Sequence, residues 1–192
     1  MPWISGNRYL TLEETENNGF IVYRYFIDQG WTDNAVCAML GNMQAESGIN
    51  PGIWESLIPY GTGYGLTQWT MYTKYSNWAI ANGYPDWEDN GQAEMECVLY
   101  SVTVTDPNDP LFLWSRNNEL GIDPPITFPE FTQSTLDIHT LSNYWLWFYE
   151  HPLDPGPSTQ ATRQAYTDAW WDRTHGTSTI PAWLLKQFIK QR

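Results

Sequence analysis

Hydrophobic residues recur every three or four positions along several stretches of the chain, a pattern that predicts a mainly helical protein. Thr11 and Glu14 have the spacing of a capping box, so a first helix should begin there and end near Gly30. A second helix should begin at Thr32 or Asp33 and end at Gly48, a suitable left-handed cap. Its buried side is predicted to be formed by Val36, Met39, Leu40 and Met43.

Similar patterns predict five further helices, over about residues 71–83, 90–102, 136–149, 158–173 and 181–191. Five prolines between residues 103 and 135 indicate loops and turns in that segment. Three closely spaced glycines and an alternating pattern predict a short β-hairpin over residues 61–70. We therefore expect an α+β fold that is mainly α-helical, with one small glycine-rich hairpin.

Composition and charge exclude several functional classes. The 192 residues fit a single domain, and a net charge of −13 disfavours binding to nucleic acid or to anionic lipid. No apolar run approaches the length of a membrane span, and residues 1–8 lack the pattern of a secretory signal. The two cysteines, Cys37 and Cys97, are interpreted as buried thiols.

The chain lacks the usual motifs of metal and nucleophilic chemistry. Its three histidines show no zinc-ligand spacing, so we expect no metal and no cofactor. It also has no nucleophile elbow and no phosphate-binding glycine loop. Carboxylate chemistry remains, and Glu46 is the leading candidate because it follows the buried stripe of the second helix by one turn.

The surroundings of Glu46 in the sequence favour its neutral form. The helix end lies close by, Met43 and Ile49 are apolar, and Lys74 is the sole base between Tyr25 and Ser115. Each factor should raise the pKa of Glu46. A carboxylic acid that stays protonated near neutral pH can act as a general acid.

Two short motifs near Glu46 resemble those of a known enzyme family. Glu46-Ser47 is followed about twenty residues later by Gly65-Leu66-Thr67-Gln68-Trp69, which resembles the paired motifs of goose-type lysozymes and lytic transglycosylases. The match extends over residues 30–32, 37–47, 49–52 and 63–70, and this set is similar to the phage-tail lysozyme family. Residues 148–152 resemble a later family motif, with His151 where the family usually has arginine.

The resemblance implies a fold, a reaction and a site. Residues 1–173 would form a lysozyme-like catalytic domain, and residues 174–192 an extension with a short amphipathic helix. Glu46 would be the general acid that cleaves the β-1,4 bond between MurNAc and GlcNAc in peptidoglycan. The hairpin would form the opposite wall of the cleft, with Ser47 and Gln68 contacting the substrate.

A second carboxylate and sugar-stacking aromatic residues complete the expected site. Glycosidases usually employ two carboxyl groups, and Glu55 and Glu150 are candidates for the second; Glu150 is also placed with the substrate-binding residues. The aromatic residues expected along the sugar groove are Trp54, Tyr64, Trp69 and Tyr149.

The implied setting is a phage tail whose other virion proteins are partners during penetration of the cell wall. Alternatives remain open on the residues alone. The chain can be a lytic transglycosylase acting on the same bond, a phage endolysin, or an inactive tail module that binds glycan. A wall peptidase is a further rival, but it would need zinc ligands or a Cys–His pair.

Overall fold

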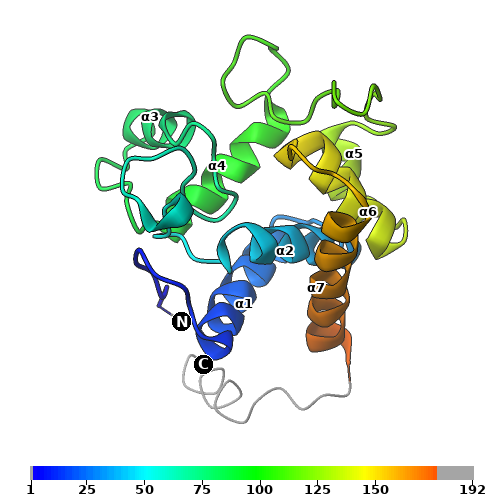
Figure 1. Cartoon of the computed structure of the whole chain (residues 1–192), viewed down its shortest axis with the longest axis horizontal. Helices are drawn as coiled ribbons and strands as arrows, with labels where there is room; N and C mark the ends of the chain where they lie inside the picture. Colours follow the sequence, from blue (N-terminus) through cyan, green and yellow to red (C-terminus); the bar gives the residue numbers. More distant parts are fainter. Residues whose placement is uncertain (1, 177–192) are drawn as a thin grey trace.

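A computed structural model describes residues 2–176, and over these residues the protein is mainly helical, as predicted. Figure 1 shows α2 in the middle of the molecule, with α3 and α4 on one side and α5, α6 and α7 on the other. The elements are α1 (Leu12–Asp28), α2 (Asp33–Ser47), η1 (Glu55–Leu57), α3 (Thr73–Ala81), α4 (Gly91–Thr103), α5 (Phe128–Thr132), α6 (Ile138–Trp145), η2 (Leu146–Glu150) and α7 (Pro157–His175).

The first two helices begin and end where their sequence signals predict. Thr11 and Glu14 form a reciprocal capping box at the start of α1. Thr32 caps α2 by accepting a hydrogen bond from the amide of Ala35. Gly48 ends α2 in the left-handed conformation, with φ of 63°. The orientation of the last turn of α2, which carries Glu46, is therefore fixed at both ends by local chemistry.

Helix α2 is the centre of the fold and packs most extensively against α7, then against α6 and α1. Gly41 makes the closest of these contacts possible. A Cβ atom at this position would lie 2.1 Å from Thr167 Oγ1 and 2.7 Å from the Thr167 backbone nitrogen. The absence of a side chain thus lets the backbones of α2 and α7 approach closely.

The predicted hairpin over residues 61–70 does not form. The segment is a series of turns, and its regular pairing is limited to one antiparallel bridge between Tyr64 and Trp54. Gly65 and Gln68 both adopt positive φ, of 76° and 50°, which interrupts an extended strand. The glycines therefore support a coiled loop instead of two strands. We call residues 61–70 the glycine loop.

Residues 104–127 form a long connection without helices, as the prolines indicated, and α5 follows it. The predicted aromatic helix over residues 136–149 is present as α6, but its last turn widens into the π-helical turn η2. His151 ends this turn in the left-handed conformation. The helix predicted over residues 181–191 lies outside the described residues.

Both cysteines are free and buried, in agreement with the prediction for Cys37 and Cys97. Burial raises the pKa of the Cys37 thiol to about 12, so it is held in its neutral form. None of the helices within residues 2–176 combines the length and hydropathy needed to cross a membrane.

Candidate active site

Glu46 projects from the last turn of α2 and is paired with an arginine. Arg163 Nη2 on α7 donates to Glu46 Oε1. The Glu46 side chain is 21% exposed to solvent and the Arg163 side chain 9%, so the pair is largely shielded. Lys74 is the sole base near Glu46 in the sequence, but α7 returns to α2 and places the guanidinium of Arg163 against the carboxyl group of Glu46.

Arg163 is held in place by the same helix that carries Glu46. Its Nη1 lies 3.2 Å from the backbone oxygen of Asn42 and 3.3 Å from Asn42 Oδ1. The Asn42 amide nitrogen in turn lies 2.9 Å from the carbonyl oxygen of Ala38 and 3.1 Å from that of Ser142. This buried network joins α2, α6 and α7 around the ion pair.

A second carboxyl group, that of Glu150, lies close enough to Glu46 and Arg163 to be affected by their charges. Glu150 belongs to η2, and its Oε1 accepts a hydrogen bond of 2.7 Å from the indole nitrogen of Trp145. Burial, and next the negative charge of Glu46, raise the pKa of Glu150 well above 4.5; Arg163 and the bond from Trp145 oppose this rise. The neutral form of the Glu150 carboxyl group is thus favoured.

The glycine loop is attached directly to the end of α2. The Ser47 hydroxyl lies 2.9 Å from the carbonyl oxygen of Leu66 and 3.1 Å from that of Met43. Ser47 is 5% exposed, so its side chain points inward and links the helix to the loop. This contact holds the loop beside Glu46. It explains structurally why a serine follows Glu46 in the sequence.

Gln68 is oriented by the backbone around it. Its amide nitrogen donates to the carbonyl oxygens of Ile53, at 3.2 Å, and Gly65, at 3.1 Å. No hydrogen bond to another described residue engages its amide oxygen. The amide oxygen of Gln68 therefore remains available as a hydrogen-bond acceptor, and the backbone of this residue has a positive φ.

Glu94, on α4, is hydrogen-bonded to the backbone of the glycine loop. It is fully buried on α4, and its Oε2 accepts a hydrogen bond of 2.6 Å from the amide of Leu66. A Cβ atom at Gly65 would lie 2.3 Å from the same oxygen, so Gly65 is required for this contact as well as for its positive φ. Burial raises the pKa of Glu94 well above 4.5.

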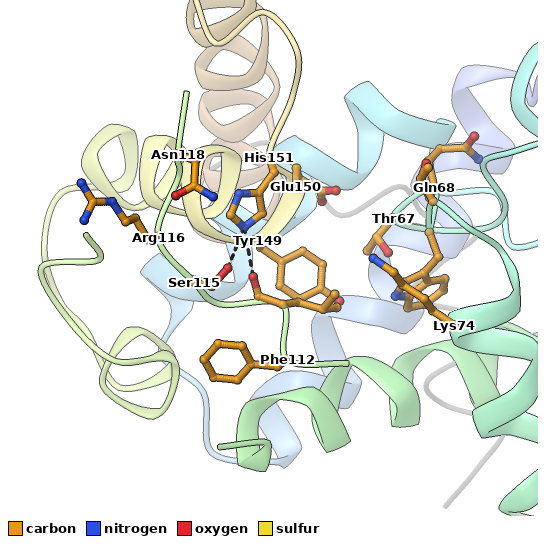
Figure 2. A pocket seen from close by; sticks show the side chains of 13 residues that line it. Thr67, Gln68, Lys74, Phe112, Ser115, Arg116, Asn118, Tyr149, Glu150 and His151 are labelled. Atoms are coloured by element: carbon orange, nitrogen blue, oxygen red, sulfur yellow. Dashed lines mark hydrogen bonds between the residues drawn. The ribbon is translucent and has the colours of Figure 1, made fainter. Parts of the chain in front are cut away.

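A pocket of about 440 Å³ opens between Glu150 and the glycine loop. Figure 2 shows Glu150, His151 and Ser115 on one wall and Thr67, Gln68 and Lys74 on the other. Ser115 is attached to the end of η2, because its amide donates to the carbonyl oxygen of Phe148 at 3.0 Å. Neither Glu46 nor Arg163 is among the residues that line the pocket, but Glu46 is close enough to the lining residue Glu150 for its charge to raise the pKa of that group.

The structure separates the four aromatic residues that the sequence placed in a groove. Trp69 and Tyr149 line the pocket, although both are largely buried. Trp54 and Tyr64 do not reach it. They pack against each other with ring centroids 4.5 Å apart, inside the hydrophobic core. Their large buried area is used for packing.

Glu55 lies on the exposed turn η1. Its Oε2 accepts hydrogen bonds from the Thr62 hydroxyl and, at 3.1 Å, from the amide of Gly63. It therefore caps the start of the glycine loop and is not brought to the pocket that Glu150 lines.

Sequence reasoning missed Arg163 and the part of the pocket formed by residues 112–118. Arg163 lies on the buried side of α7 with Thr167 and Trp170, at helical spacing. A lone arginine on such a stripe signals a buried carboxylate partner. The pocket residues of the proline-rich segment gave no comparable signal, because irregular loops carry no periodic pattern. No group of three His, Cys, Asp or Glu side chains within residues 2–176 has a geometry suited to a metal ion.

Comparison with known proteins agrees with the motifs around Glu46. The family model described as phage tail lysozyme matches residues 17–173. The chain is also 39% identical over 165 residues to morphogenesis protein 1 of Bacillus phage B103. That match covers 84% of this chain and 41% of the relative, so the chain spans about two fifths of that protein's length. The matched region contains α2, the glycine loop and α7, and the chain belongs to the phage tail lysozyme family.

Proposed function

We propose that this protein is a glycosidase that hydrolyses the β-1,4 bond between MurNAc and GlcNAc in peptidoglycan, as part of a phage tail that opens the host wall. The family supports a peptidoglycan-degrading tail enzyme. The observation that carries the finer proposal is the pair of carboxyl groups, Glu46 and Glu150, gathered around Arg163 beside a pocket. Two carboxyl groups beside the substrate are the usual equipment of a glycosidase.

The two carboxyl groups have different roles. We assign Glu46, in its protonated form, the transfer of a proton to the glycosidic oxygen as the C–O bond breaks, and water supplies the hydroxyl group of the new reducing end. Glu150 is the second carboxyl group, and burial favours its neutral form. The amide oxygen of Gln68 accepts a hydrogen bond from a sugar hydroxyl or from the attacking water.

The first test is Glu46→Gln, assayed by the clearing of cell-wall suspensions. The amide still accepts the hydrogen bond from Arg163, so the fold should be retained, while the acid is lost. We expect lysis to fall by roughly 10²–10⁴-fold, the usual contribution of a general acid. A circular dichroism melt provides the check on folding. Full activity in this variant would refute the assignment of Glu46.

The second test is Glu150→Gln, assayed as the pH dependence of kcat/KM. The amide preserves the acceptor for Trp145 and removes a carboxyl group whose pKa is raised by burial and by the charge of Glu46. We expect a loss of about 10²-fold and an alkaline limb displaced to lower pH. Glu55→Gln serves as the matched control and should leave the profile unchanged. The reverse result would make Glu55 the second carboxylate.

Mass spectrometry of the released muropeptides distinguishes hydrolysis from transglycosylation. Hydrolysis leaves reducing-end sugars, whereas a lytic transglycosylase leaves 1,6-anhydro ends. We expect reducing ends, because Glu150 provides the second carboxyl group that glycosidases usually employ. Anhydro ends that depend on Glu46 would keep the site assignment and replace the reaction.

A further inference from the structure

The pocket beside Glu150 has an unusual charge for so acidic a protein. Among its lining residues Glu150 is the sole acid, whereas Lys74 and Arg116 are cations and His151 adds an imidazole. The whole chain carries a net charge of −13. A positive wall inside an acidic molecule concentrates anionic groups locally and needs an explanation.

Lys74 is the most informative of these residues. It lies on α3, is partly buried, and has no ion pair or side-chain hydrogen bond with any residue in the described part of the chain. The carboxylate of Asp109, which shares a neighbouring hollow with Lys74, is already bound to the hydroxyl of Tyr100 at 3.2 Å and the amide of Leu111 at 2.8 Å. Burial lowers the pKa of Lys74 below 10.5, as expected of an ammonium without a counter-ion.

The opposite end of the pocket is also positively charged, but it is more open. Arg116 is 53% exposed and lies 3.7 Å from Asp123. Beside it, His151 Nε2 lies 3.1 Å from the carbonyl oxygen of Leu113 and 3.3 Å from the Ser115 hydroxyl. Because a carbonyl oxygen only accepts, a hydrogen bond to Leu113 requires a proton on Nε2. Figure 2 shows Arg116 and Lys74 at opposite sides of the cavity.

We propose that this pocket binds the carboxylates of the stem peptide on muramic acid, and that Lys74 is the main contact for one of them. This inference rests on the proposed function. The muramic acid ring carries its peptide on the lactyl ether at O3, so a ring held at Glu46 and Glu150 directs the peptide into an adjacent cavity. A lysine ammonium is a compact donor that pairs well with a carboxylate in a partly buried site.

The test measures equilibrium binding, which does not require catalysis. The probe is the disaccharide peptide GlcNAc–MurNAc–stem, compared with the same molecule after its carboxyl groups are converted to methylamides. We expect Lys74→Gln to weaken binding of the free-carboxylate form by about tenfold and to leave binding of the methylamide unchanged. Arg116→Gln should have a smaller effect in the same direction, because Arg116 is more exposed and lies near Asp123.

Arg8→Gln is the matched control. It also removes one positive charge, but Arg8 is paired with Glu14 and does not line the pocket, so binding should not change. Equal weakening of both probes by Lys74→Gln, or no weakening of either, would overturn the proposal. Lys74-dependent binding of a glycerol phosphate oligomer, with none for the stem peptide, would also overturn it. Charge-dependent binding without any cleavage would count against the proposed function alone.

Discussion

At the scale of single residues, Glu94 is a fully buried carboxyl group whose contribution to the stability of the fold depends on pH. Its carboxyl group meets one donor, the amide of Leu66, and the charge of Asp89 adds to the cost of ionising it. No described residue provides Glu94 with a cation or bonds its Oε1. The glycine loop therefore depends on a carboxyl group that is most stable with its proton.

This predicts a pH-dependent stability. The pKa of Glu94 is higher in the folded protein than the usual 4.5, so the folded state binds more protons above that pH. Its contribution is complete below about pH 4.5 and is lost as the pH rises toward the folded pKa, by at most about 1.4 kcal/mol per pH unit. Glu94→Gln should therefore gain in Tm relative to the parent protein as the pH rises from 4.5 to 8.

Glu96→Gln is the control for this measurement, because Glu96 lies on the same helix and is partly exposed. It should preserve the pH dependence of the parent protein. Glu150 contributes a slope of the same sign, but it is present in all three proteins and cancels in the differences. A constant difference in Tm between Glu94→Gln and the parent protein would contradict a neutral Glu94.

Residue-level reasoning selected Glu46, Ser47, Gln68 and Glu150 as candidates because short motifs carry them. It missed Arg163, the partner of Glu46, which lies 117 residues away in the sequence. No local pattern reports such a contact. It also placed Trp54 and Tyr64 along a groove, since an aromatic side chain in a sequence gives no sign of whether it packs in the core or faces a ligand.

At the scale of elements, the contact between α2 and α7 positions the ion pair. Gly41 lies five residues before Glu46, where the backbones of α2 and α7 approach closely. Thr167 and the carbonyl oxygen of Arg163 occupy the space that a side chain at position 41 would need. The contact between Arg163 and Glu46 therefore depends on residue 41 being a glycine.

Gly41→Ala should separate the two helices and weaken the site. The added methyl group meets backbone atoms that cannot rotate away, so we expect destabilisation of about 1–3 kcal/mol, typical of overpacking. Lytic activity should fall further than the loss of folded protein accounts for. Thermal melting and wall clearing on the same samples measure both effects.

Gly61→Ala provides the comparison, because its nearest neighbour would lie at 3.1 Å and it belongs to a surface loop. It should cost much less stability. The double variant Gly41→Ala/Thr167→Ala removes the Thr167 hydroxyl but not the backbone clash, so it should remain destabilised. Restoration of the Tm in that variant would show that the hydroxyl alone sets the distance.

Elements were predicted well where local chemistry determines them. The capping box at Thr11, the cap at Thr32 and the left-handed Gly48 are signals within four residues, and each is present in the structure. The hairpin was predicted incorrectly because positive φ at Gln68 is imposed by its contacts with Ile53 and Gly65. The π-helical turn η2, which presents Glu150, has no known signature in the spacing of the aromatic residues.

At the scale of the whole molecule, charge is distributed unevenly. A net charge of −13 would be repelled by an anionic cell wall, so the proposed function requires sugar contacts or attachment to a larger particle to bring the protein to the wall. The pocket is the exception, with Lys74 and Arg116 on its walls. Long-range repulsion is screened within about 8 Å at physiological salt, and a pocket contact is screened less.

The pairing of Arg163 with Glu46 also has a consequence for synthesis. While the chain emerges from the ribosome, Glu46 is made long before α7, which is the last helix among the described residues. A nascent chain that has released only α1 to α6 holds an unpaired carboxylate and an uncovered Gly41 surface. The pair of Glu46 and Arg163 thus forms only late in synthesis, and premature termination anywhere before residue 163 would yield fragments without it.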